Sequence, residues 1–137
     1  MALYDHVQEA ATAIQTRTSL KPLVALILGS GLGELATEIA DAVAIPYAEI
    51  PHFARSTVTG HAGRLLIGTL EDVPVVTMQG RFHLYEGHAP DVAALPTRVF
   101  ARLGATTLVV TNAAGGIRFT FRPPTLMLIA DHINLMF

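Results

Sequence analysis

The chain has 137 residues, of which 51% are apolar and only 15% are charged, against about 25% charged in a typical domain. Its formal net charge of −2 argues against a basic surface for nucleic acid, and the absence of cysteine excludes disulfide and thiolate chemistry. With no signal-peptide pattern and no apolar run near the roughly 20 residues that span a bilayer, we expect a single cytoplasmic domain over residues 1–137 without membrane contact.

The first part of the chain predicts a helix, a strand and a second helix. Apolar residues recur at helical spacing over residues 3–18. Residues 23–28 (LVALIL) form a short apolar run between Pro22 and Gly29, which is typical of a strand buried on both faces. Residues 32–40 (LGELATEIA) then suit a helix.

The middle of the chain predicts a hairpin and a further helix. Residues 64–79 (RLLIGTLEDVPVVTMQ) indicate two strands joined by a turn at residues 71–72. Residues 89–104 indicate a helix that ends at Gly104, in which Pro96 would cause a kink or a restart.

Two more strands are expected, a buried one over residues 106–112 (TTLVVTN) and another over residues 126–136 (LMLIADHINLM). The sequence therefore predicts the α/β class, with a mixed, mostly parallel central sheet flanked by helices. Three of the apolar strands end in small or polar residues, in the segments LILGSGLG, VVTMQGRFH and VVTNAAGG. Because ligands of open α/β sheets bind beyond the carboxyl ends of the strands, these three ends would meet at one site.

The glycine-rich segment GSGLG, residues 29–33, suits an anion such as phosphate. Its glycines permit a sharp turn with exposed N–H groups, Ser30 adds a hydroxyl, and a following helix would add its positive end. A plain strand-to-helix turn explains the same residues. A dinucleotide fold, with Glu49 on the ribose, is a minor alternative, because Glu34 stands where the G-x-G-x-x-G pattern requires glycine.

The segment QGRFHLYEGH, residues 79–88, places a dense set of polar side chains directly after an apolar strand. In extended chain Arg81 and His83 point to the same side, and arginine is suited to bidentate contact with phosphate or carboxylate. The alternative is a surface ion pair between Arg81 and Glu86 with a solvated histidine.

Two further segments are less specific. The segment TNAAGG, residues 111–116, offers exposed backbone amides and one amide side chain, or else an ordinary glycine-rich turn. His61 lies in a long irregular stretch that could be a lid or a plain connector, and a lone histidine there is more often a surface residue.

Five segments occur in an order and at spacings that resemble the purine nucleoside phosphorylases of the trimeric type: LILGSGLGELA, TGHAGRL, VVTMQGRFHLYEGH, LVVTNAAGGI and LMLIADHINLM. The resemblance extends over nearly the whole chain, but only over the N-terminal half of the family's usual length. It implies the family's phosphorylase/hydrolase-like fold in a single domain, with an incomplete sheet.

The resemblance also implies a phosphate site. Arg81 and His83 would hold inorganic phosphate, with Ser30 and the backbone N–H of Ala113 completing the contacts. The implied reaction is the phosphorolysis of purine nucleosides, in purine salvage, to free base and ribose 1-phosphate. Phosphate would be a co-substrate, and neither a metal nor an organic cofactor would be needed.

Two more residues receive roles from the resemblance. Tyr85 would contact the ribose, and His61 would lie near the 5′ end of the nucleoside, so that His83, Arg81 and His61 form the expected catalytic set. The family's base-activating glutamate and asparagine belong to the C-terminal half and have no counterpart here. The residues after Gly116 (IRFTFRPPTLML) also depart from the family's pattern.

Two functions therefore stay open. The chain is either a purine nucleoside phosphorylase in a shortened or incomplete form, with weak activity alone, or a non-catalytic phosphate- or nucleotide-binding domain derived from that family. The resemblance implies a homotrimer for the full-length form. The low charged fraction indicates either strands buried on both faces or a surface covered by a partner. The purine that is recognised cannot be read from these residues.

Overall fold

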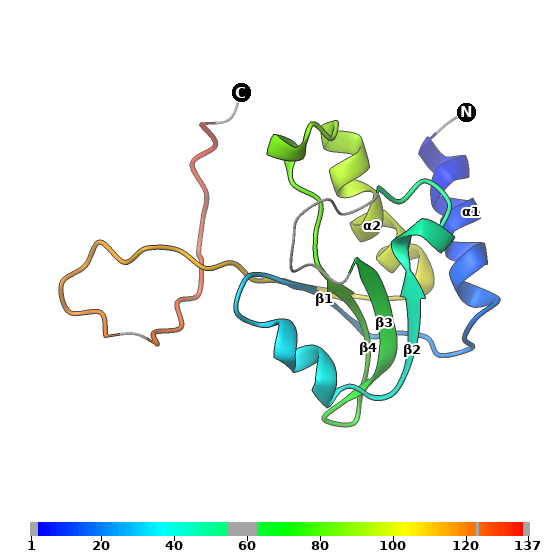
Figure 1. Cartoon of the computed structure of the whole chain (residues 1–137), viewed down its shortest axis with the longest axis horizontal. Helices are drawn as coiled ribbons and strands as arrows, with labels where there is room; N and C mark the ends of the chain where they lie inside the picture. The colour runs from blue at the N-terminus through cyan, green and yellow to red at the C-terminus, as the bar shows by residue number, and fades with distance from the viewer. Residues whose placement is uncertain (1–2, 55–62, 123, 136–137) are drawn as a thin grey trace.

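The computed structural model describes residues 3–54, 63–122 and 124–135, and Figure 1 shows their arrangement. Five strands form one sheet in the order β2-β3-β4-β1-β5. The strands are β1 (Val24–Leu28), β2 (Ala40–Pro46), β3 (Arg64–Leu70), β4 (Val73–Gln79) and β5 (Thr107–Val110). The helices are α1 (Leu3–Gln15) and α2 (Pro90–Leu103), with short 3₁₀ helices η1 (Gly33–Glu38), η2 (Tyr47–Glu49) and η3 (Leu84–Glu86).

The sheet is mixed, as predicted, with β1 between two parallel neighbours. Val24 of β1 is in register with Val75 of β4 and with Thr107 of β5. On the other side of β4, strands β3 and β2 continue the sheet in antiparallel pairing. The predicted turn between β3 and β4 is confirmed at Glu71 and Asp72, whose φ angles of 48° and 61° are those of a tight two-residue hairpin.

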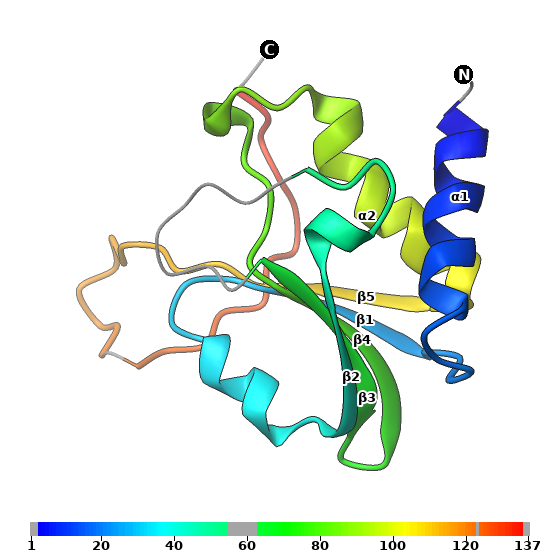
Figure 2. The ribbon, with the colours of Figure 1, turned by 45° about the vertical axis from the view of Figure 1, so that its right-hand side comes forward.

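Helices α1 and α2 cover one face of the sheet, and η1 lies against the other face (Figure 2). The larger core joins the two helices to side chains from all strands except β5, among them Ile14, Ile27, Ile45, Leu65, Val76, Val99 and Phe100. The smaller core on the η1 face comprises Leu26, Leu28, Ala36, Ile39, Leu66 and Val75. Strands β1 and β4 are therefore buried on both faces, which explains their continuous apolar runs.

The helices predicted over residues 3–18 and 89–104 are confirmed as α1 and α2. Helix α1 buries the apolar positions that recur at helical spacing, and α2 ends at Gly104 with a left-handed φ of 113°. Pro96 lies inside α2 as a buried residue, so the helix neither ends nor restarts there. No helix within the described ranges is long and apolar enough to cross a membrane.

The prediction of a helix over residues 32–40 is wrong in its length and type. A 3₁₀ helix covers only Gly33–Glu38, and Ile39 is already extended. The chain then forms β2, a strand that the sequence analysis did not predict. Strand β2 forms by pairing with β3, a long-range contact that local propensity does not indicate. The sequence of β2 also lacks a clear apolar pattern, because only Ile45 is buried in the main core and most other residues of the strand are exposed.

Of the last two predicted strands, the first is confirmed as β5 but not as a buried strand, and the second does not form. Strand β5 forms, but all four of its residues are exposed, since it is the edge strand next to β1. Residues 126–135 form no strand, and they are exposed throughout. An extended segment becomes a strand only when another strand pairs with it, and none of the described strands pairs with this segment.

Candidate active site

The carboxyl ends of β4, β1 and β5 lie at the same edge of the sheet (Figure 2). Parallel pairing brings Leu28 of β1 into register with Gln79 of β4, and Ile27 into register with Val110 of β5. The three polar segments that follow these strands therefore begin side by side. This arrangement is the convergence that the apolar runs predicted.

Thr111, the residue after β5, joins all three strand ends. Its hydroxyl oxygen accepts a hydrogen bond from the backbone N–H of Gly29 at 2.8 Å and donates to the carbonyl of Ile27 at 3.2 Å. Its carbonyl accepts from Nη1 of Arg81 at 2.9 Å. Thr111 is the first residue of the segment TNAAGG, but no role for its side chain was predicted; its position at the end of an apolar run, directly before Asn112, is the signal that could have found one.

Arg81, His83 and Glu86 form a short relay of hydrogen bonds. Nε of Arg81 donates to Nε2 of His83 at 3.0 Å, and Nδ1 of His83 lies 2.9 Å from a carboxylate oxygen of Glu86. Because the arginine N–H can only donate, His83 accepts at Nε2 and carries its proton on Nδ1. The same carboxylate accepts the backbone N–H of His83 at 2.8 Å and is almost fully buried, with 4% of the side chain exposed.

The structure does not show the alternative ion pair between Arg81 and Glu86. Glu86 binds His83 instead and so fixes the orientation of the imidazole ring. The sequence analysis treated Glu86 as a competitor for the arginine. Its place three residues after His83, at the start of a one-turn helix, is the capping pattern that could have shown the correct partner.

The other predicted site residues are less constrained. Ser30 and Ala113 are exposed on the segments that follow β1 and β5. Tyr85 is 78% exposed, and its ring stacks on that of His83 with centroids 4.6 Å apart. His61 lies outside the described residues. The roles predicted for these four residues therefore stay predictions.

Gln79, at the end of β4, ties the glycine-rich turn to the sheet. Its amide oxygen accepts from Nε of Arg64 at 2.7 Å, and its amide nitrogen donates to the carbonyl of Gly33 at 3.3 Å. Glu49, the residue of the dinucleotide alternative, instead lies 2.6 Å from Nη1 of Arg17 in an exposed ion pair.

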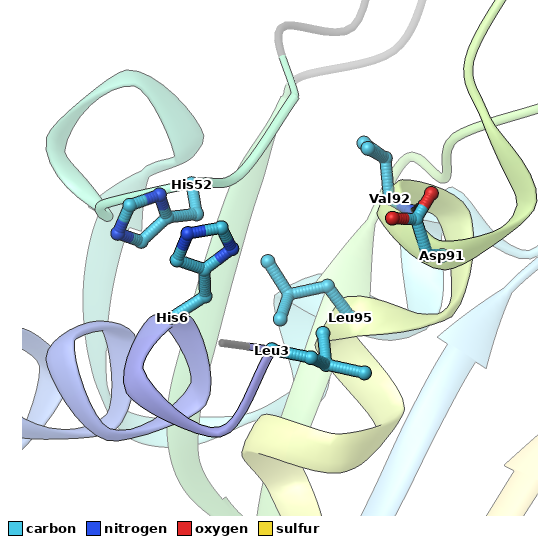
Figure 3. Close-up of a pocket in the computed structure, with 6 residues that line it drawn as sticks. All are labelled: Leu3, His6, His52, Asp91, Val92 and Leu95. Carbon is cyan, nitrogen blue, oxygen red and sulfur yellow. Dashed lines mark hydrogen bonds between the residues drawn. The ribbon is translucent and has the colours of Figure 1, made fainter. Parts of the chain in front are cut away.

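A separate pocket of about 170 Å³ lies on the helix side of the sheet, away from these strand ends (Figure 3). It is bounded by α1, α2 and the segment before residue 54, and the rings of His6 and His52 stack at its side with centroids 3.9 Å apart. Among the residues that the structure describes, no three histidine, aspartate or glutamate side chains are grouped so that they could hold a metal ion. The strand ends themselves present the guanidinium of Arg81, whose N–H groups are donors suited to an anion.

Comparison with known proteins agrees with this geometry. Residues 23–137 match the family described as the phosphorylase superfamily. The chain is 52% identical over 130 residues to purine nucleoside phosphorylase 1 of Geobacillus stearothermophilus, covering 95% of this chain and 47% of that protein. It is 50% identical over 132 residues to the purine nucleoside phosphorylase of Rattus norvegicus, covering 96% of this chain and 46% of that protein.

Solved structures give the same result. A purine nucleoside phosphorylase in complex with ribose-1-phosphate superposes with a TM-score of 0.79 at 48% identity, over 86% of this chain and 43% of the other. The Schistosoma purine nucleoside phosphorylase in complex with inosine gives a TM-score of 0.79 at 46% identity, over 86% of this chain and 41% of the other. The chain thus spans about half the length of the curated relatives it matches.

The contact between Gly29 and the end of β5 provides a direct test of the geometry. A Cβ atom on Gly29 would lie 2.4 Å from the carbonyl oxygen of Thr111 and 2.9 Å from Cα of Asn112. We predict that Gly29→Ala lowers the free energy of unfolding by about 1–3 kcal/mol, because the backbones of β1 and β5 must move apart. The matched control is Gly33→Ala, where an added Cβ has no neighbour within 4 Å. Denaturant unfolding of both variants would show an equal, small effect if the strand ends were not in contact.

Proposed function

This chain belongs to the phosphorylase superfamily, and we propose that it supplies the phosphate-holding half of a purine nucleoside phosphorylase. In the proposed reaction a purine nucleoside and inorganic phosphate are converted into the free base and ribose 1-phosphate. We propose that phosphate occupies the edge of the sheet beyond β4, β1 and β5, in contact with Arg81, His83, Ser30 and the backbone N–H of Ala113.

The observation that carries this proposal is the anchoring of Arg81. Its Nε and Nη1 atoms each donate to a fixed neighbour, His83 and Thr111, within the described residues. A guanidinium has five N–H donors in one plane, so further donors are available to an anion. Because the side chain is already held in place, little conformational entropy is lost when the anion binds.

The chemistry requires an oriented phosphate and a stabilised transition state. A phosphate oxygen forms a bond to the anomeric carbon while the bond from that carbon to the purine nitrogen breaks, through an oxocarbenium-like state. The held phosphate is both the aligned nucleophile and a negative charge beside the developing positive sugar. His83 lies beside the proposed anion and orients Arg81, whose Nε–H it accepts at Nε2 while its Nδ1–H donates to Glu86.

The departing purine needs a group that protonates it or hydrogen-bonds to it, and no carboxylate available for this lies on the part of the strand ends that the structure describes. Glu86 is buried and accepts two hydrogen bonds from His83. We therefore propose that base activation depends on groups beyond the described strand ends. We also propose a contact between Tyr85 and the ribose, and a position for His61 near the 5′ end of the nucleoside.

The assembly and setting follow from the same family. We propose a homotrimer for the family-length protein, a cytoplasmic location, and a reaction without metal or organic cofactor. Surface chemistry supports an assembled state, because large apolar side chains are exposed on β5 and in the segment after it. Those at least 40% exposed are Leu108, Val109, Val110, Ile117, Phe119, Leu126, Met127, Leu128, Ile129, Ile133 and Leu135.

The first prediction concerns the anion. Arg81→Ala should weaken phosphate or sulfate binding by about 1.5–3 kcal/mol, which is the contribution of a hydrogen bond to a charged group. Isothermal titration calorimetry on the native chain and the variant measures it. The control is Arg98→Ala, an exposed arginine on α2, which should bind as the native chain does. Equal affinity in the native chain and Arg81→Ala would rule out this site.

The second prediction concerns turnover. With inosine or guanosine and phosphate, this chain alone should release base at least about 10²–10³ times more slowly than a family-length enzyme, because a transition-state donor for the base is missing. Adding a family-like C-terminal half in trans should raise the rate. Full activity of the chain alone would contradict the proposed division of the site, and no gain on complementation would favour a non-catalytic binding domain.

The third prediction concerns association. We expect this chain to self-associate, since β5 is the edge strand of the sheet that the described residues form and carries exposed apolar side chains. Light scattering over a concentration series would show a mass that rises with concentration. Val109→Lys should reduce the effect by placing a charge on the edge strand. A monomer at every concentration would contradict the prediction.

A further inference from the structure

Tyr47 is buried beneath the segment that carries Arg81 and His83. It begins η2, directly after β2, and only 1% of it is exposed. Its hydroxyl donates a hydrogen bond to the backbone carbonyl of Gly80 at 2.6 Å. Gly80 is the residue before Arg81 and has a φ of 100°, so the chain turns at this peptide as it leaves β4. The tyrosine hydroxyl therefore fixes the backbone at the turn itself.

The ring of Tyr47 also packs against Phe82, the residue after Arg81. Phe82 is buried and packs edge-to-face on Tyr47, with ring centroids 5.2 Å apart, and Phe53 completes the cluster at 5.8 Å from Tyr47 and 6.1 Å from Phe82. In extended chain, alternate side chains point to opposite sides. With Phe82 held in the core, Arg81 and His83 are directed to the other side, where they bind Thr111 and each other.

The backbone around Tyr47 is tied to the same strand end. The N–H of Tyr47 donates to the carbonyl of Gly63 at 2.9 Å, and the N–H of Gly63 donates to the carbonyl of Gln79 at 3.1 Å. Tyr47 is thus joined to the end of β4 through its backbone, its hydroxyl and its ring. A core tyrosine that served only to fill space would not need its hydroxyl at this position.

We propose that Tyr47 is a positioning residue for the phosphate site, which it orients by fixing the Gly80 peptide and the Phe82 ring on either side of Arg81. The role in phosphate binding rests on the proposed function, whereas the effect of Tyr47 on the position of Arg81 does not depend on it. Tyr47 touches neither phosphate nor nucleoside in this scheme. Burial raises the pKa of Tyr47 well above its usual value, so the hydroxyl remains a donor at neutral and mildly basic pH.

The test uses Tyr47→Phe, which removes the hydroxyl and keeps the ring. Nuclear magnetic resonance of ¹⁵N-labelled protein follows the Nε–H signal of Arg81 and the backbone amide of the same residue. We expect the Nε–H signal to shift and both protons to exchange faster with solvent in the variant. The matched control is Tyr4→Phe, an exposed tyrosine at the start of α1, which should leave both signals unchanged. An unchanged Arg81 signal in Tyr47→Phe would overturn the inference.

Phosphate titration separates this inference from the proposed function. Tyr47→Phe should bind inorganic phosphate about five- to tenfold more weakly than the native chain, the effect of losing one hydrogen bond that orders the site. If the native chain binds no phosphate, the proposed function fails, while the Arg81 signals still decide whether Tyr47 positions that side chain. If the native chain binds phosphate and the variant binds it equally, the inference fails alone.

A second core variant, chosen to be destabilised to a similar extent, tests whether Tyr47 acts only by stabilising the fold. Val99→Ala lies in the same core, on α2, and should lower the melting temperature without changing phosphate affinity or the Arg81 signals. If Tyr47→Phe does not fold, Phe53→Leu loosens the same ring from its other neighbour and should shift the Arg81 signals in the same direction. Changes in Val99→Ala as large as those in the Tyr47 or Phe53 variant would overturn the positioning role.

Discussion

The close approach of β1 and β5 at Gly29 and Thr111 is the constraint on which the strand-end site depends. The N–H of Gly29 reaches the threonine hydroxyl at 2.8 Å, and there is no space between the two backbones for a Cβ atom. A glycine at this position lets the two strand ends meet, and the meeting places the carbonyl of Thr111 where Arg81 of the third strand end can bind it. The position of the arginine therefore follows from a backbone contact between two other segments.

The rigidity of the site has its source in the two cores. Strands β1 and β4 are buried on both faces, and the segment after β4 is held by the buried ring of Phe82 and by the bond from the Tyr47 hydroxyl to the carbonyl of Gly80. Holding the flexible arginine in advance removes much of the entropy cost of binding a small, strongly hydrated anion. An exposed arginine on a mobile loop would offer the same charge but would pay that cost on each binding event.

The sequence predicts the convergence of the strand ends because continuous apolar runs followed by small or polar residues are a local signal. Arg81 and His83 are found in the same way, from their alternation in extended chain. Thr111, β2 and the bond of Tyr47 to Gly80 are not found, because each depends on a partner elsewhere in the fold. Thr111 and Gly29, for example, are 82 residues apart in sequence. Helical spacing indicates a helix for residues 32–40, whereas the 3₁₀ helix ends at Glu38 and pairing with β3 begins at Ala40.

The apolar pattern of β5 predicts the strand correctly but its burial wrongly. The sequence of Thr107–Val110 is that of a strand covered on both faces, yet every residue in it is exposed. The exposed apolar residues continue from Ile117 to Leu135, in a chain whose charged fraction is only 15%. Apolar side chains at this density are stable in water only when another surface covers them. The low charged fraction and the position of β5 at the edge of the described sheet both agree with the proposed self-association, and β5 leads directly to Thr111, whose carbonyl binds Arg81.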